Sequence, residues 1–483
     1  MKLKKLTALL LAGIMALSLT ACGKSDAPAE KKDETPVESS EPAADDAQEP
    51  ADENNDDQTA AADLSGELVV WTLANDLISF ADKFMETYPD VKVETIVIAP
   101  EDYPTKLQSA LLGGETEPDI IVGEPQMLGN WYEAGFFEDL NQAPYNAQDY
   151  ADQIVDYIWK IGQDENGIQR AISYQITPVA VYYRRDIAKD VFGTDDPDEV
   201  GKLFADYTTI LDTGYKLKDA GYRIFASDAE PGFFSGDSAW VIDGKLNVDQ
   251  DRYDYMDLVT ELYNNDLTAF ASQWAAPWYQ AMSGPVPILT AETQWGTDEM
   301  NIWDADSFAA ATEGADTAEV FAFVLPSWGV VTMRDNVDDN AGKYGVCAGP
   351  SYQYNGGTFI GISAQSERKE LSWEFIKFCT LSEETADWWI EYSQGDTVSL
   401  ISALEKHKDD TNEIYGGQKL YQFFLGQAEH IDFSKITKYD KAINDAWGAA
   451  ITAVKQGDKS KEDAVAEFYD VVSATYPELT IER

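Results

Sequence analysis

The sequence predicts an α/β protein with two lobes, each a mainly parallel sheet flanked by helices. Three strand–helix pairs follow one another between residues 67 and 134, which is typical of βα units. Strand-like runs recur at 179–183 and 358–363, each with further helical segments after it. Residues 64–483 exceed the ~250–300 residues that one hydrophobic core usually supports, so we expect two lobes.

Apolar periodicity places the individual elements. In the first helix Leu77, Phe80 and Phe84 recur at helical spacing, and Pro89 ends the pattern. The run Ile120–Val122 is apolar throughout, as in a strand covered on both faces. The predicted strands lie at 67–71, 91–98, 119–122, 179–183 and 358–363. The predicted helices lie at 77–88, 104–112, 126–134, 368–392, 436–456 and 460–475.

Polar residues follow three of the predicted strands directly, at 72–76, 100–103 and 123–126. In the third of these loops, the apolar strand stops abruptly at Gly123-Glu124-Pro125-Gln126. Ligands of parallel sheets bind outside the carboxyl ends of the strands, where these loops would lie. None of the three has a glycine-rich phosphate-binding pattern, so a nucleotide site is disfavoured.

The first 63 residues read as a targeting segment and a tether. Lysines precede an apolar run from Leu6 to Ala21, which is too short to span a bilayer and predicts a signal peptide over 1–21. The run ends Leu19-Thr20-Ala21-Cys22, which resembles a bacterial lipobox and implies a lipid on the Cys22 sulfur. After Cys22, the stretch to residue 63 has 14 Asp or Glu and no aromatic residue, so 22–63 is predicted to be a disordered acidic linker.

Composition excludes several classes of function. A net charge of −52 argues against binding nucleic acid or an anionic membrane surface. Beyond Cys22, the two cysteines and two histidines form no zinc motif, and no Gly-x-Ser-x-Gly elbow or EF-hand spacing is present. We therefore expect no metal, no cofactor and no catalytic residues. The default for Cys347 and Cys379 is two buried thiols.

Five segments in order resemble the extracellular carbohydrate-binding proteins of bacterial ABC importers, the family that includes the maltose-binding protein. They are the opening strand with the helix ending at Tyr88-Pro89-Asp90, the stretch Pro118–Leu140, the strand Pro178–Asp186, the strand Gly356–Ser363, and the helix around Trp373–Phe378. The resemblance implies the two-lobe periplasmic-binding-protein fold (type II), with a sugar held in a cleft between hinged lobes. It implies an N-terminal lobe of 64–176 plus 353–398 and a C-terminal lobe of 177–352 plus 399–483.

Carrying the family's binding positions over gives a set of candidate ligand residues. From the N-terminal lobe they are Asn75, Asp76, Glu101, Tyr103, Glu124 and Gln126. From the crossings and the C-terminal lobe they are Gln175, Trp278, Trp328, Gly357, Thr358, Gln394 and Asp396. Six of them have a plainer alternative: Asp76 as a helix cap, Tyr103, Trp278 and Trp328 as core, and Glu124 and Gln126 as a solvated loop. The maltose-binding pattern has a Trp where Gly123-Glu124 stands, which favours a different sugar.

The resemblance implies a substrate-binding lipoprotein that captures a mono- or oligosaccharide and delivers it to the permease. It would be a monomer on the outer face of the cytoplasmic membrane, attached through its lipid alone. One alternative is a binding protein for a polyamine, a peptide or a metal complex, because the loops are acidic. Another is a surface glycosidase, which needs two carboxyl groups ~5–9 Å apart.

Overall fold

The computed structural model describes residues 64–482 apart from 236–238, 432 and 434–436. The predicted signal peptide, the lipidation site Cys22 and the linker lie outside these described residues. Across the described ranges, no helix is both long enough and apolar enough to cross a membrane.

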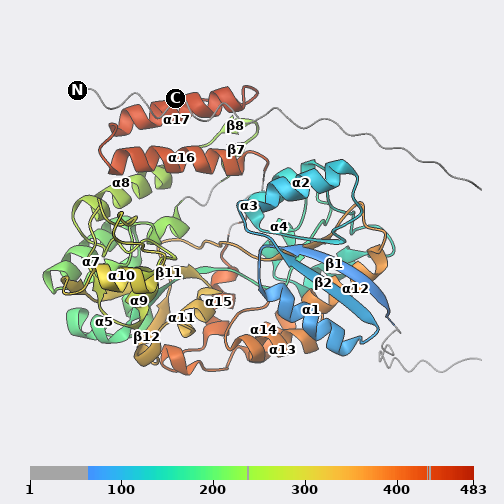
Figure 1. The fold of residues 1–483 in the computed structure, drawn as a ribbon, viewed down its shortest axis with the longest axis horizontal. Helices are drawn as coiled ribbons and strands as arrows, with labels where there is room; N and C mark the ends of the chain where they lie inside the picture. Colours follow the sequence, from blue (N-terminus) through green and yellow to red (C-terminus); the bar gives the residue numbers. More distant parts are fainter. Residues whose placement is uncertain (1–63, 236–238, 432, 434–436, 483) are drawn as a thin grey trace, which may run out of the picture. The chain divides into compact units, whose positions relative to one another are not determined.

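The first sheet has the strand order β2-β1-β3-β13-β4 and lies on the right of Figure 1. Its strands are β1 (Gly66–Thr72), β2 (Val91–Val97), β3 (Ile120–Gly123), β4 (Ile172–Ser173) and β13 (Phe359–Ile362). The helices around it are α1 (Asp76–Thr87), α2 (Tyr103–Gly113), α3 (Pro125–Glu133), α4 (Asp156–Ile161) and α12 (Lys369–Thr380). Strand β3 is buried throughout, and α1 buries Leu77, Phe80 and Phe84 against the same core, so the periodicity identified both elements.

The second sheet has the order β12-β5-β11-β6 and lies on the left of Figure 1. Its strands are β5 (Val179–Arg184), β6 (Arg223–Phe225), β11 (Val320–Pro326) and β12 (Tyr344–Cys347). Helices in this half are α5 (Arg185–Phe192), α6 (Pro197–Gly201), α7 (Tyr207–Asp219), α8 (Gln250–Asn264), α9 (Ala276–Ser283), α10 (Ala305–Ala311) and α11 (Gly329–Arg334). The short pairs β7 (Val241–Ile242) with β8 (Lys245–Leu246), and β9 (Val286–Pro287) with β10 (Thr317–Ala318), are antiparallel.

Both sheets are mixed. The first is paired in parallel over most of its register, as predicted, whereas the second is mainly antiparallel, so the prediction of a mainly parallel sheet was wrong for that half. Strand β1 pairs in parallel with β2 and β3, but β13 is antiparallel to β3 and β4. In the second sheet β11 is parallel to β6, while β5 is antiparallel to β11 and β12. Strands β5 and β13 each enter their sheet from the other half. They are therefore not bound to the parallel geometry that a helical crossover within one sheet imposes.

Four helices complete the C-terminal part: α14 (Ile401–His407), α15 (Leu420–Ala428), α16 (Asp440–Lys455) and α17 (Lys461–Thr475). The predicted single helix over 368–392 is two helices, α12 and α13 (Glu383–Ser393). The helix breaks because the Ser382 side chain accepts a hydrogen bond from the backbone N–H of Thr385 and caps α13. Cys379, in α12, and Cys347, in β12, are both buried free thiols.

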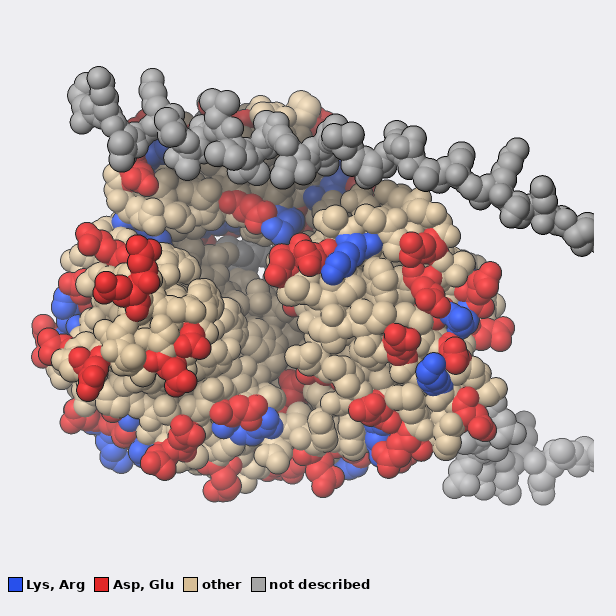
Figure 2. Space-filling view, in the orientation of Figure 1, with Lys and Arg blue, Asp and Glu red and all other residues tan. Residues whose placement is uncertain are grey.

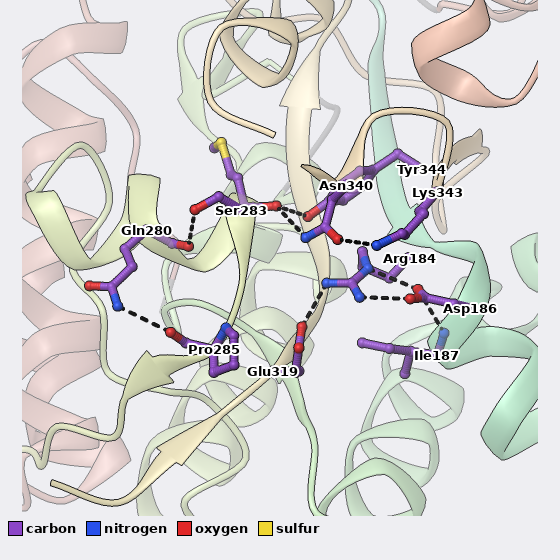
Figure 3. A network of polar contacts seen from close by, with 11 residues as sticks. Arg184, Asp186, Ile187, Gln280, Ser283, Pro285, Glu319, Asn340, Lys343 and Tyr344 are labelled. Atoms are coloured by element: carbon purple, nitrogen blue, oxygen red, sulfur yellow. Dashed lines mark hydrogen bonds and ion pairs between the residues drawn. The ribbon is translucent and has the colours of Figure 1, made fainter. Parts of the chain in front are cut away.

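A buried arginine ties the second half together (Figure 3). Arg184, at the end of β5, donates to both oxygens of Asp186 at 2.8 and 2.7 Å and to Glu319 at 2.7 Å. It is 4% exposed, so its charge needs both partners. In the same view, Asn340 and Tyr344 donate to the backbone oxygen of Met282, which fixes the end of α9 against β12.

Gly123 ends β3 because the space beside it is filled. A Cβ atom at this position would lie 2.6 Å from the Trp131 ring and 3.0 Å from Leu128. Close packing of α3 on the strand end is therefore what requires the glycine.

Gly123→Ala should lower the free energy of unfolding by about 1–2 kcal/mol through overpacking, measured by urea denaturation. The matched control is Gly448→Ala in α16, whose Cβ would meet no atom within 4 Å. Because alanine is the better helix former, this control should leave stability equal or higher. Equal stability of the two variants would contradict the packing explanation.

Candidate binding cleft

A cleft of about 800 Å³ lies between the two halves, which are hollowed there in Figure 2. Its lining comes from the start of α1, from Glu124 before α3, from α11, from α13, and from the segments that cross between the sheets. Nine predicted ligand residues line it: Asn75, Asp76, Glu124, Gln175, Trp328, Gly357, Thr358, Gln394 and Asp396. The structure thus brings together residues up to 321 positions apart in the chain.

Asp76 lies at the first position of α1, directly beyond the carboxyl end of β1. Its carboxylate accepts a hydrogen bond of 2.7 Å from the Tyr174 hydroxyl. It makes no cap hydrogen bond, and the N-cap position belongs to Asn75, whose side chain also makes none. Burial raises the pKa of Asp76, and the Tyr174 hydroxyl partly offsets that rise. The helix-cap alternative is therefore not what the geometry shows.

Asp396 is the most buried carboxylate of the cleft, at 3% exposure. One oxygen accepts from the indole N–H of Trp389 at 3.0 Å and the other from the backbone N–H of Thr397 at 2.9 Å. Burial, together with the nearby charge of Asp76, raises the pKa of Asp396 to about 7. Gln394 and Gly395, both with positive φ, form the turn that brings Asp396 back into the cleft after α13.

Gln175 connects the crossing segments, and its side-chain oxygen is a hydrogen-bond acceptor without a donor in the described part of the chain. Its Nε2 donates to the Tyr174 hydroxyl at 3.2 Å and to the Thr358 hydroxyl at 3.0 Å. Its Oε1 is buried and has no hydrogen-bond partner among the described residues, although the side chain is 4% exposed and lines the cleft. A buried amide oxygen without a partner costs about 1–3 kcal/mol, which a ligand donor would recover.

Trp328 supplies an aromatic surface from the C-terminal side. It lies two residues after the end of β11, is half-buried, and donates its indole N–H to the backbone oxygen of Asn355 at 3.2 Å. Its ring lies 5.8 Å from the Trp274 ring at an interplanar angle of 32°. At Gly356, whose φ is +75°, a Cβ would lie 3.2 Å from the Trp328 nitrogen, so the glycine allows this close approach.

Glu124 occupies the N-cap position of α3 and is hydrogen-bonded by Gln126. The side chain of Gln126 donates to Glu124 Oε2 at 2.9 Å, while Gln126 itself is exposed and does not line the cleft. Burial raises the pKa of Glu124, and the Gln126 hydrogen bond partly offsets the rise. Gln126 thus positions Glu124 and lies outside the cleft.

Residues 79–414 match the family described as bacterial extracellular solute-binding protein. The chain belongs to that family. The resemblance of the five sequence segments is thereby confirmed. A relative, the erythritol/L-threitol-binding protein of Mycolicibacterium smegmatis, is 23% identical over 391 residues, which is 76% of each chain.

Two solved structures show the same fold. An extracellular solute-binding protein of family 1 superposes with a TM-score of 0.67 at 18% identity, covering 84% of this chain and 99% of its own. The ABC transporter associated binding protein of B. animalis subsp. lactis Bl-04, in complex with β-1,6-galactobiose, has a TM-score of 0.62 at 17% identity. That match covers 87% of this chain and 100% of the other. The two-lobe α/β fold expected from the sequence is confirmed.

Three other predicted ligand residues of this solute-binding protein lie outside the cleft lining. Glu101 is exposed in the turn before α2. Tyr103 is fully buried, donates to the backbone oxygen of Trp71 at 2.7 Å and accepts from Val122, so it belongs to the core. Trp278 is also fully buried, and its indole N–H donates to Glu230.

Several residues of the cleft were not predicted from the sequence. They are Ser79, Arg334, Asp335, Asn355 and Tyr392. Arg334 donates to Asp335 at 2.7 Å and to the backbone oxygen of Ser393, which links α11 to α13. Arg334 and Asp335 lie at the end of α11, the short helix that follows β11. The spacing of side chains in so short a helix does not indicate which of its faces lines the cleft.

Trp278 is predicted to stabilise the fold through its hydrogen bond to Glu230. Ligand affinity should not depend on Trp278 directly. Burial raises the pKa of Glu230 to about 8, and the N–H groups of Trp278 and Val324 partly offset the rise. Trp278→Phe removes one donor and should lower the free energy of unfolding by about 1–2 kcal/mol. Ligand affinity by titration calorimetry should change less than about threefold. An affinity loss as large as that of a Trp328 variant would place Trp278 in the binding site.

Proposed function

We propose that this protein is the substrate-binding component of an ABC importer and holds a sugar or polyol in the cleft. The observation that carries this proposal is the unpaired Gln175 Oε1 beside the carboxylates of Asp76 and Asp396 and the indole of Trp328. Hydroxyl groups both donate and accept hydrogen bonds, and the C–H face of a sugar packs on a flat aromatic ring. A permease would take the ligand from the closed protein.

The choice of a polyhydroxy ligand is supported by one named relative and one neighbour. The relative at 23% identity is named for erythritol and L-threitol, and the structure from B. animalis holds β-1,6-galactobiose. Short polyols and disaccharides therefore define the range of ligands to test. In the same proposal, the protein acts by binding alone and catalyses no reaction.

Ligand capture would close the cleft by rotation about the segments that cross between the sheets. The backbone oxygen of Ile176 accepts from the hydroxyls of Ser327 and Thr397, each at 2.7 Å. Asn355 donates from its backbone to the oxygen of Thr177 at 3.1 Å, which joins the other crossing. These contacts support lobes bounded as expected, with 64–176 plus 353–398 in one and 177–352 plus 399–483 in the other. A ligand touching both lobes favours the closed state by its extra affinity for that state.

The proposal extends to how the protein is held at the cell. Cleavage of residues 1–21 and lipidation of Cys22 would leave a monomer on the outer face of the cytoplasmic membrane. Replacing Cys22 with serine should release the protein into the medium of the producing cells. Membrane retention of that variant would argue against the lipid anchor.

A thermal-shift screen tests the binding function. The mature protein is heated with tetritols, monosaccharides and disaccharides, and with spermidine as a ligand of another class. A compound that binds only the native state raises the melting temperature in proportion to the logarithm of its concentration. A shift with spermidine and none with any polyhydroxy compound would overturn the proposal. Release of reducing ends from an oligosaccharide would instead indicate a glycosidase.

A further inference from the structure

The cleft carries more negative charge than a neutral ligand requires. Four carboxylates line it, from Asp76, Glu124, Asp335 and Asp396, against one guanidinium, from Arg334. That guanidinium donates to Asp335 and to the backbone oxygen of Ser393. No lysine or histidine is among the residues that line this cleft. The charge of Arg334 also acts on Asp396 and lowers its pKa, so this one guanidinium serves two of the four carboxylates, and no cationic side chain of the lining pairs with Asp76 or Glu124.

Three hydrogen-bond donors near these carboxylates are engaged within the protein. The Tyr174 hydroxyl donates to Asp76, the Trp389 indole to Asp396, and the Trp328 indole to Asn355. The Nε2 of Gln175 is shared between two hydroxyls, and its Oε1 is the buried atom without a partner. The carboxylates of Asp76 and Asp396 and the Gln175 Oε1 are thus three acceptors of the cleft lining. Their complement is a ligand group that donates several hydrogen bonds.

A divalent metal ion does not meet this description. Among the residues that the structure describes, no three His, Cys, Asp or Glu side chains are grouped so that they could hold a metal. Calcium takes six to eight oxygen ligands and magnesium nearly ideal octahedral geometry. An organic ammonium needs less, because its three N–H groups reach acceptors that are spread over a cleft wall.

We propose that the ligand of this cleft is an amino sugar or amino polyol, whose protonated amine lies between Asp76 and Asp396 near Gln175 Oε1. This inference rests on the proposed function and names the class of its ligand. Charge-assisted hydrogen bonds are about twice as strong as neutral ones, and here they are made in a buried site. The hydroxyl groups and ring of the ligand remain available to Trp328 and Glu124.

The buried state of the two carboxylates supports this assignment. Asp76 and Asp396 both have raised pKa values, with burial as the main cause in each case. Ionising both in the empty cleft is therefore unfavourable, and an ammonium ion supplies the missing positive charge. A neutral polyol brings no positive charge, so it leaves the ionisation of the two neighbouring side chains as unfavourable as in the empty cleft.

Matched ligand pairs test the inference. The dissociation constants of glucosamine, galactosamine and chitobiose-derived diamines are measured by calorimetry at pH 7.5 beside glucose, galactose, cellobiose and the neutral N-acetylated amino sugars. We expect at least one amine to bind ten-fold or more tighter than both of its neutral counterparts. Neutral sugars binding as tightly as every amine would overturn the inference and leave the proposed function intact. Spermidine binding without binding of any amino sugar would overturn both.

Variants test whether the two carboxylates cause the tighter binding of amines. Asp76→Asn and Asp396→Asn should each reduce the ratio of amine to neutral affinity at least threefold, whereas Glu101→Gln should leave it unchanged. Glu101 is exposed and outside the cleft, so its variant controls for loss of one negative charge. Near-ultraviolet circular dichroism checks that each variant is folded. An unchanged ratio in both aspartate variants would place the amine elsewhere and overturn the assignment.

Discussion

Replacing Trp328 with alanine should weaken ligand binding by at least about 100-fold, equivalent to about 2.7 kcal/mol. The side chain lines the cleft and presents an aromatic ring whose edge is fixed by the Asn355 backbone oxygen at 3.2 Å. Truncation removes the flat apolar surface on which a sugar face packs, and aromatic rings of this kind dominate binding energies. Titration calorimetry with the best ligand of the thermal-shift screen measures the change.

Trp295→Ala is the matched control for this prediction. Trp295 is 64% exposed and does not line the cleft, so its loss should leave affinity within about twofold. Trp328→Phe keeps an aromatic face but loses the indole N–H, and should fall between the wild type and the alanine variant. Because Trp328 is half-buried, urea denaturation must show that the alanine variant remains folded under the conditions of binding. Equal affinities of wild type and a folded Trp328→Ala would remove the residue from the site.

The residues predicted correctly share a position that sequence patterns identify. Asp76 lies shortly after β1 and Glu124 directly after β3, and the carboxyl ends of such parallel strands meet at the ligand side. Trp328 follows the strand of the other sheet in the same way. Strand ends can be found from apolar runs, so this part of the cleft followed from the sequence.

Tyr103 and Trp278 show why the sequence could not distinguish ligand-binding residues from core residues. Each is amphipathic and lies near the start of a helix, but each turns its ring into the core and donates its hydrogen bond to a protein acceptor. Burial of an aromatic side chain depends on what packs against it, which periodicity does not specify. Arg334 and Tyr392 were missed for the converse reason, since only the arrangement of α11 and α13 brings them to the cleft.

Trp274 is a second aromatic residue whose importance is visible only in the structure. Its φ of +69° is uncommon for a bulky residue and its side chain is 40% exposed. Its ring contacts both Trp278 and Trp328. Strained backbone and an exposed ring beside the cleft indicate a position held by its surroundings rather than by local preference.

The stability of the empty protein should fall as the pH rises from about 4 to about 7, and Asp396→Asn should remove much of that dependence. The folded-state pKa of Asp396 is about 7, above the ordinary value of 3.8, because of burial and the nearby charge of Asp76. Between these two values the folded state holds a proton that the unfolded state has lost. Stability is therefore highest below about pH 4 for this group and decreases through pH 7.

The difference in unfolding free energy between Asp396→Asn and wild type should thus grow by about 3 kcal/mol from pH 4.5 to pH 8, in favour of the variant. Urea denaturation at both pH values measures it. Asparagine alters the hydrogen bonds from Trp389 and Thr397 equally at both pH values, so the change with pH isolates ionisation. Asp76 in α1, Arg334 in α11 and Tyr174 in the crossing segment face the same region, and all three are common to both proteins. A difference independent of pH would contradict the raised pKa of Asp396.

Saturation with ligand should change how the free energy of unfolding depends on pH. The stability of the fold is therefore coupled to the ligand that is bound. An amine between Asp76 and Asp396 stabilises their ionised forms, so the pKa of Asp396 in the complex should fall toward its ordinary value. The destabilisation of wild type between pH 4.5 and pH 8 would then be smaller in the presence of ligand than in its absence. A neutral ligand leaves the two carboxylates without a cation and should leave that dependence in place. The empty cleft is therefore expected to be least stable at the pH at which it binds an amine most tightly, as in other sites where function opposes stability.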